Sequence, residues 1–365
     1  MTIRWRKFAF AVLTLAGTAG LPLLASTAEA GGPACGCQSS CGCSDSVPFS
    51  KYGDGSEPGV APENALADSD FNLGEGAAAQ SGNSFAALDA AGAYIDSAIV
   101  ASRFRVRFDS AYNNPIPDRA EFFYGQCAVA GPPLLERSVD YQEITPYFEW
   151  AYNDCVSFFV ETPVRFINPD INDNTAGFSD MNAGFKYALI ASADEYLTLQ
   201  FRAYAPTGDN TRGLGTGHTS LEPSVLYFRR LTQRLIVQAE VRDWIPIGGT
   251  ELNGQNFSGN VIRYGAGFGY DVMQSCDVCS NEKLTFVSEF VGWTIMDGLG
   301  TDGGNGGGIG GLGNVVDQSG VTIVNAKLGL RYTTGADSLY AGYGTALSDQ
   351  VWYQEIFRAE YSRAF

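Results

Sequence analysis

Residues 102–108, SRFRVRF, alternate basic and apolar side chains without a break. Successive side chains of an extended chain point to opposite faces, so Phe104, Val106 and Phe108 share one face and the intervening arginines share the other. The stretch therefore predicts a β-strand with one apolar and one charged face. What each face meets depends on how many such strands the chain contains and how they are connected.

The same alternation recurs along the chain, in YLTLQFRAYA (196–205), RLIVQAEVR (234–242), VNAKLGLRY (324–332) and, at the very end, FRAEYSRAF (357–365). Together these segments predict about twelve strands. We expect them near residues 102–112, 141–152, 155–167, 178–191, 196–206, 219–230, 235–247, 260–273, 284–296, 321–333, 338–347 and 353–365.

The connections between these strands alternate between short and long. Short turns are expected at residues 153–154, 192–195, 231–234 and 334–337, and a somewhat longer one holds Cys276 and Cys279. Most of the others are longer, such as 114–138 and the Gly-rich segment 297–314. Short turns on one side and long loops on the other are typical of an up-and-down barrel in an outer membrane, and they predict that both barrel ends of the chain are periplasmic.

The composition agrees with this all-β interpretation. Hydrophobic residues make up 45% of the 365 residues, charged residues only 17%, and there are 44 glycines. A formal net charge of −17 makes nucleic acid an unlikely partner, because it repels phosphates. A soluble β-sandwich with a solvated charged face is the alternative, but the secretory signal described next favours the membrane barrel.

The N-terminal part of the chain differs from the rest. Residues 1–30 combine basic residues, an apolar run and Ala28-Glu29-Ala30, which predicts a cleaved secretory signal, with an uncleaved anchor as the alternative. Residues 31–83 are rich in Gly, Ser and Ala and predict a flexible periplasmic tail. Residues 84–100 predict a short amphipathic helix that could plug the barrel, which we expect to span 101–365.

A resemblance to a known family appears in the middle third of the chain. It rests on the G-x-x-D motif at 177–180, the A-P-T-G-D motif at 205–209 and the G-T-G-x-x-x-L-x-P motif at 215–223. These motifs resemble the outer-membrane proteins named for phenol meta-pathway degradation. The resemblance implies a transporter-like outer-membrane barrel for hydrophobic or aromatic compounds.

The polar face of the strands supplies the candidate site. Facing the inside of a closed barrel, it would form a narrow, wet lumen crossed by ion pairs, since about twelve strands lie between a filled barrel of eight and an open porin of sixteen. The candidate lumen-lining residues are Arg103, Arg105, Arg107, Glu143, Glu161, Arg202, Glu240, Arg242, Arg263, Arg331, Arg358 and Glu360. Phe365 and Tyr361 of the final strand resemble the terminal aromatic signal that barrel-assembly machinery recognises.

The cysteines predict disulfides rather than a cofactor. Cys35, Cys37, Cys41 and Cys43 could hold a soft metal ion, but a secreted tail favours local disulfides. Cys276 and Cys279 are expected to staple their turn. We expect no cofactor.

Three functions remain open at this stage. The favoured one is a channel for small solutes, with membrane lipid, assembly machinery and the solute as partners. The second is a structural or adhesive barrel with a closed lumen. The third, an outer-membrane lipase, would need His218, the only histidine, with Thr219 or Ser220; a histidine in a Gly-rich loop is more often solvated, so we expect no enzyme.

Overall fold

The computed structural model describes residues 94–252, 254–275, 282–302 and 314–365. Within these ranges nearly all regular structure is β, and there is no helix with the length and apolar character of a membrane span. The main strands are β1 (Arg103–Asn114), β2 (Val139–Ala151), β3 (Val156–Glu161), β4 (Val164–Pro169), β5 (Thr175–Phe178), β6 (Met181–Ala191), β7 (Glu195–Ala205), β8 (Thr219–Arg230), β9 (Leu235–Ile247), β12 (Val261–Gln274), β13 (Lys283–Ile295), β16 (Thr322–Thr334), β17 (Asp337–Ala346) and β18 (Glu355–Ala364).

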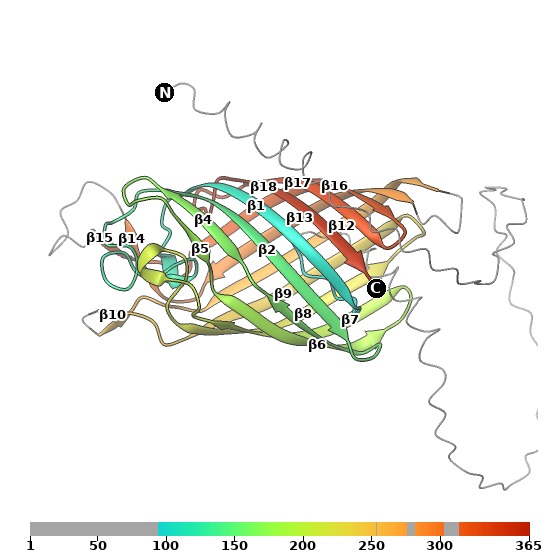
Figure 1. The fold of residues 1–365 in the computed structure, drawn as a ribbon, viewed down its shortest axis with the longest axis horizontal. Coiled ribbons are helices and arrows are strands. Elements are labelled where there is room, and N and C mark those ends of the chain that lie inside the picture. The colour runs from blue at the N-terminus through green and yellow to red at the C-terminus, as the bar shows by residue number, and fades with distance from the viewer. Residues whose placement is uncertain (1–93, 253, 276–281, 303–313) are drawn as a thin grey trace, which may run out of the picture. The chain divides into compact units, whose positions relative to one another are not determined.

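These strands form one closed antiparallel barrel (Figure 1). Most strands pair with the strands before and after them in the barrel sequence, and β1 pairs with both β2 and β18, which closes the sheet. In the closing pair, Arg103 lies opposite Ala364 and Tyr112 opposite Glu355. We call each stretch of chain that crosses the barrel once a wall. β3 and β4 together form one wall, and β5 and β6 together form the next, so the fourteen strands make twelve walls. The predicted up-and-down barrel is therefore confirmed.

Two of the predicted strands are interrupted. The wall expected at 155–167 breaks between Glu161 and Val164, where Pro163 lacks the N–H that a central strand would donate. The wall expected at 178–191 breaks at Ser179 and Asp180. The first interruption lies near the middle of its wall, and the second lies toward the end of the barrel that carries the long loops. The period of two continues through the first break and could not reveal it. At the second break the alternation shifts by one residue, because Phe178 points outward and Asn182 inward, and the single strand expected at 178–191 overlooks this shift.

The two ends of the barrel differ as the connection lengths predict. Tight turns join β6 to β7, β8 to β9 and β16 to β17, and the C-terminus lies at this same end (Figure 1). The opposite end carries the long loops, including the hairpins β10 (Glu251–Leu252) with β11 (Gln255–Asn256) and β14 (Leu299–Asp302) with β15 (Asn314–Asp317). It also carries two short 3-10 helices, η2 (Arg119–Glu121) and η3 (Asn210–Arg212).

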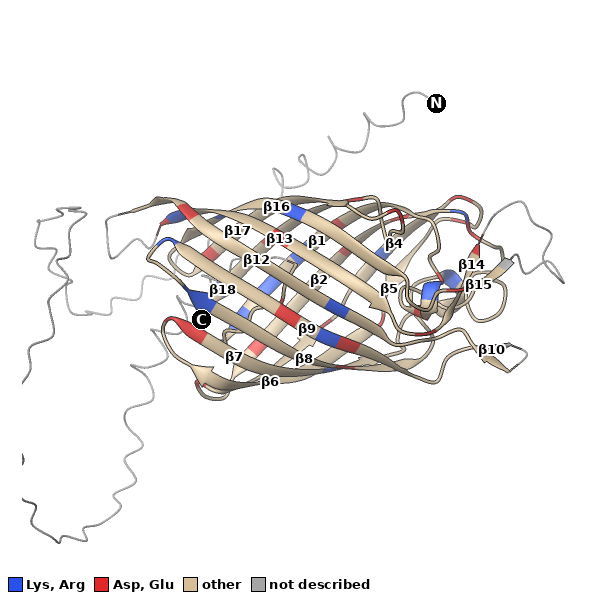
Figure 2. Cartoon of the chain, turned by 180° about the vertical axis from the view of Figure 1, so that it is seen from behind, with Lys and Arg blue, Asp and Glu red and all other residues tan. Residues whose placement is uncertain are grey.

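The outer surface of the barrel is apolar. Exposed side chains on the outward positions include Phe104, Phe148, Trp150, Phe158, Phe185, Leu199, Val241, Phe268, Phe290, Leu328, Leu330, Tyr343 and Phe357. They come from most walls, so the band surrounds the barrel. Water would disfavour an exposed surface of this size, whereas the hydrocarbon of a membrane would accept it. Charged positions are nonetheless frequent along the strands (Figure 2), and their side chains must point inward.

A segment outside the sheet lies within the barrel. Residues 94–101 precede β1, contain no helix and are buried throughout except for the half-buried Asp96. The predicted helix at 84–100 is therefore wrong over its last seven residues, and its first ten lie outside the described residues. The helical spacing misled because the apolar side chains of this segment contact barrel walls on several sides. We call residues 94–101 the lumen segment.

Several other predictions fall outside the described residues. They are the signal segment 1–30, the tail 31–83 with Cys35, Cys37, Cys41 and Cys43, and the turn with Cys276 and Cys279. Cys127 and Cys155, which are described, are both free thiols.

Candidate functional site

The interior of the barrel holds a network of ion pairs centred on the lumen segment. The carboxylate of Asp96 lies 2.8 Å from an Arg202 guanidinium nitrogen and 3.2 Å from one of Arg242. Glu222 joins the two arginines, at 3.1 Å from Arg242 and 3.8 Å from Arg202. The backbone N–H of Asp96 also donates to Glu240, so these walls hold both the side chain and the backbone of the lumen segment.

A second cluster lies where β1 meets β2. Glu149 is fully buried and lies 2.7 Å from Arg103 and 3.1 Å from Lys186. Its oxygens also accept hydrogen bonds from the hydroxyls of Tyr147, at 2.5 Å, and Ser157, at 2.6 Å. Both oxygens of this carboxylate therefore accept hydrogen bonds, which offsets part of the free-energy cost of burying its charge.

The seam between β1 and β18 is also bridged by charge. Asp109 and Arg358 are directly opposite each other, and their side chains form two hydrogen bonds of 2.6 and 2.7 Å. Arg105 lies 3.0 Å from Glu161 and 3.9 Å from Glu360. The inward face of the final strand is therefore joined to β1 by ion pairs.

All twelve predicted lumen residues point into the barrel. The other ion pairs in which they take part are Arg107 with Asp109 at 3.2 Å, Arg165 with Glu143 at 2.8 Å, Arg263 with Glu240 at 3.0 Å, Arg331 with Glu360 at 3.2 Å, and Glu240 with Arg242. Whether they line a path for solutes stays a prediction. The candidate set omits Asp96, Asp109, Glu149, Lys186, Glu222, Glu289 and Lys327. The alternation places all of these except Asp96 on the polar face, whereas the predicted helix concealed the role of Asp96.

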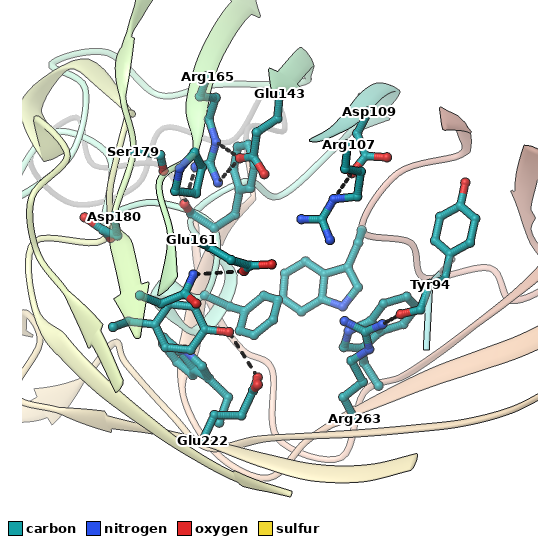
Figure 3. Close-up of a pocket in the computed structure, with 18 of the residues that line it drawn as sticks. Tyr94, Arg107, Asp109, Glu143, Glu161, Arg165, Ser179, Asp180, Glu222 and Arg263 are labelled. Carbon is teal, nitrogen blue, oxygen red and sulfur yellow. Dashed lines mark hydrogen bonds and ion pairs between the residues drawn. The ribbon is translucent and has the colours of Figure 1, made fainter. Parts of the chain in front are cut away.

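A cavity of about 250 Å³ remains in the interior (Figure 3). Its wall contains both charge signs and an unusual number of aromatic rings. Figure 3 shows Arg107, Glu161 and Glu222 facing this space, with Tyr94 and Arg263 on another side. Aromatic lining residues are Tyr94, Phe122, Phe123, Tyr141, Tyr204, Trp244, Trp293, Trp352 and Tyr353. The cavity is large enough for a small organic molecule.

On the side of the short turns, the lumen segment closes the barrel. Ala98, Ile99, Val100 and Ala101 pack into one apolar cluster with side chains of the surrounding walls. Those wall residues are Ala188, Tyr196, Leu226, Phe228, Ile236 and Ala364. The side chains of the lumen segment thus fill space in the lumen that the side chains of the strands leave open.

On the side of the long loops, residues 115–138 fold into the mouth of the barrel. We call them the mouth loop. Arg119, Ala120 and Glu121 of η2 are fully buried, and Ala120 and Glu121 adopt positive φ values of 50° and 49°. Such values are rare for residues with a side chain, so surrounding contacts must hold them. Phe122 packs in the same region against Trp244 and Trp352, with ring centroids 5.0 and 4.9 Å away.

Side chains of the mouth loop bind the other long loops. Asp118 accepts the N–H of Thr301 at 3.0 Å, Glu121 accepts that of Thr250 at 2.9 Å, and Arg119 donates to the carbonyl of Val351 at 3.1 Å. Burial raises the pKa of Asp118 and lowers the pKa of Arg119 to about 10. The mouth loop is therefore tied to three separate segments at this end of the barrel, and its Phe122 and Phe123 side chains line the cavity.

His218 belongs to this mouth region and is buried, at 7% exposure, so the expectation of a solvated side chain is wrong. Its ring lies 5.5 Å from that of Trp244, and Nδ1 lies 3.3 Å from both the Ser220 hydroxyl and the Thr219 carbonyl. Nε2 lies 3.9 Å from Glu121. Glu121 already accepts the backbone N–H groups of Gln126 and Thr250. We therefore interpret His218 as a residue that packs the mouth loop against the barrel wall.

The final strand has the predicted facing. Phe357 and Phe365 are exposed outward, whereas Arg358, Glu360 and Ser362 are buried inside. The ring of Phe365 stacks on Phe148 with centroids 5.8 Å apart, and the hydroxyl of Tyr361 donates to Asp337 at 2.7 Å. The role of Phe365 and Tyr361 in assembly stays a prediction.

A closed antiparallel barrel with an apolar outer belt and a charged interior defines a transmembrane β-barrel of the outer-membrane type. A comparison with protein-family models finds no match, and a comparison with curated proteins finds none either. Membership of the phenol meta-pathway family therefore stays a prediction.

Solved structures of outer-membrane barrels are similar to this chain. The NanC porin is 11% identical, covering 73% of this chain and 99% of its own, with a TM-score of 0.41. An outer membrane channel from Pseudomonas putida F1 is 14% identical over 75% of this chain and 98% of its own, with a TM-score of 0.46. The KdgM porin in complex with disordered oligogalacturonate is 8% identical over 72% and 99%, with a TM-score of 0.40. At these scores the likenesses carry no argument about function, so the class rests on the barrel itself.

Proposed function

We propose that this protein is an outer-membrane channel for small solutes, closed at the short-turn end by the lumen segment and at the other end by the mouth loop. The observation that carries the proposal is the placement of the lumen segment. A barrel that serves only as a scaffold can fill its interior with side chains of its own walls. Here residues 94–101, which belong to no strand, fill the lumen, and removing them would leave a charged passage.

The chemistry of the interior supports the same function. Most lumen charges are paired and buried, yet the cavity beside them has room for a small molecule and offers both polar and aromatic contacts. The charges favour small polar solutes, and the rings favour planar ones, in keeping with the hydrophobic or aromatic compounds that the family resemblance implies. In this proposal the short turns and both ends of the barrel chain lie in the periplasm, and the long loops lie outside the cell.

Swelling of liposomes measures passage directly. Proteoliposomes with the full chain are placed in iso-osmotic solutions of sugars, amino acids and aromatic acids, and they should swell slowly. Proteoliposomes with a variant whose lumen segment is held less tightly should swell faster, and more so with small solutes than with large ones. If liposomes with either protein swell no faster than empty liposomes, the result would support the structural or adhesive barrel instead.

A further inference from the structure

The ring of Tyr94 occupies a slot between the side chains of Lys327 and Arg358. Lys327 Nζ lies 3.4 Å from the centroid of the ring, and the guanidinium carbon of Arg358 lies 3.8 Å from the same centroid. Cations placed over an aromatic face are attracted by its π electrons, most strongly where water is excluded. Tyr94 is 3% exposed, so both contacts are shielded from water.

The slot binds the ring of Tyr94 rather than its hydroxyl. The hydroxyl oxygen is buried and has no hydrogen-bond partner among the described residues. The backbone of Tyr94 is held separately: its N–H donates to Glu289 at 3.3 Å, and its carbonyl accepts from Arg263. The side chain could therefore leave the slot while the backbone of the lumen segment stays in place.

Among the described residues, Lys327 Nζ has no carboxylate beside it in the slot. Arg358 is paired with Asp109, and Arg263 with Glu240. The carboxylate nearest to Lys327 along the sheet is Glu289, directly opposite it, but the Glu289 oxygens accept the N–H groups of the lumen segment. Within the described part of the chain, Lys327 Nζ contacts the hydroxyl of Tyr353 at 2.8 Å and three aromatic rings, and no carboxylate lies within 4 Å of it.

The slot also opens into the cavity. Tyr94, Lys327, Arg358, Trp293 and Tyr353 all line the same space of about 250 Å³. A molecule in the cavity would meet the edge of the slot directly, and Trp293 and Tyr353 would add ring contacts beside it.

From these observations we infer that the slot between Lys327 and Arg358 is a binding site for small aromatic carboxylates, and that Tyr94 occupies it in their absence. The ring of the ligand would replace the ring of Tyr94, and its carboxylate would pair with Lys327. Tyr94 and the ligand then compete, so binding would free the side chain of Tyr94 from the slot. The inference rests on the proposed channel function for its meaning, although the site itself can be tested without transport.

Calorimetric titration of the full chain in detergent tests the site, with benzoate as probe and cyclohexanecarboxylate as a probe of equal charge that lacks π electrons. Tyr94→Ala should bind benzoate at least about tenfold more tightly than the parent does, and about tenfold more tightly than it binds cyclohexanecarboxylate. Tyr94→Phe, which keeps the slot filled, should bind benzoate as weakly as the parent.

Folding of each variant is checked by the heat-dependent gel shift typical of barrels, and Lys327→Gln in the Tyr94→Ala background should abolish benzoate binding. Equal affinity of Tyr94→Ala for the two probes, or equal benzoate affinity of Tyr94→Ala and the parent, would overturn the inference. Because no transport is measured, either result would leave the channel function to its own test.

Discussion

Thr216 donates its backbone N–H to the carboxylate of Asp180 over 2.7 Å, and its hydroxyl donates to the same oxygen over 2.9 Å. The other oxygen of Asp180 accepts the N–H of Gly208 at 3.0 Å. Asp180, Gly208 and Thr216 belong to the three separate motifs on which the family resemblance rests. These motifs therefore meet at one carboxylate and fix the loop between β7 and β8 against the interrupted wall of β5 and β6.

Replacing Asp180 should loosen this loop without opening the barrel. Asp180→Ala removes three hydrogen bonds to a charged acceptor, each worth about 1.5–3 kcal/mol, although water can replace part of them at a half-buried site. We expect faster protease cleavage between residues 206 and 218. The exposed Asp173→Asn serves as a control in a neighbouring loop and should leave cleavage unchanged. Equal cleavage of all three proteins would contradict the role assigned to Asp180.

Asp96 should control how often the lumen segment leaves the barrel. Asp96→Ala removes the pairs with Arg202 and Arg242 from the closed state only, because both arginines keep Glu222 when the segment is out. A loss of about 1.4 kcal/mol would raise the open fraction about tenfold. Open probability in planar bilayers measures this, and Asp194→Ala, which removes the same charge from an exposed turn, should behave like the parent.

The C-terminal residue should matter for assembly, and its neighbour two positions earlier should not. Deleting Phe365 removes the ring that stacks on Phe148 and a backbone hydrogen bond of 3.2 Å to Ser102 at the barrel seam. Arg363 is exposed and lies 3.4 Å from Asp337, a surface pair worth about 0–1 kcal/mol. Arg363→Leu should therefore appear in the outer membrane at parental levels, whereas the deletion should not. Normal membrane levels of the deletion variant would remove the support for a terminal signal.

His218 should contribute to the structure of the mouth and not to catalysis. Its contacts with Trp244, Ser220 and Glu121 are packing contacts under the mouth loop. His218→Ala should lower thermal stability, and the purified parent should hydrolyse p-nitrophenyl esters no faster than the variant does. Ester hydrolysis that the parent shows and His218→Ala loses would identify an enzyme.

The sequence alone predicts the walls of this barrel closely, since β8 and β9 match the expected residues 219–230 and 235–247 at both ends. A period of two shows on which face of a strand each side chain lies. Once the sheet closes into a barrel, the polar face of every strand becomes the interior. The contents of the interior are harder to predict. Arg119 meets Gln350, 231 positions away, and Asp96 meets Arg202, and no local pattern encodes such contacts. The prediction of a helix in the lumen segment is wrong for the same reason, because most of its contacts are with residues distant in sequence.

The central claim is that a charged passage exists and that the N-terminal part of the chain closes it. Single-channel recording in planar bilayers tests this most directly, by comparing residues 31–365 with a variant that also lacks residues 31–100. We predict rare, brief openings for the longer protein and long-lived steps of uniform conductance for the variant. Persistent silence of a correctly folded variant, or identical conductance of the two proteins, would contradict the account.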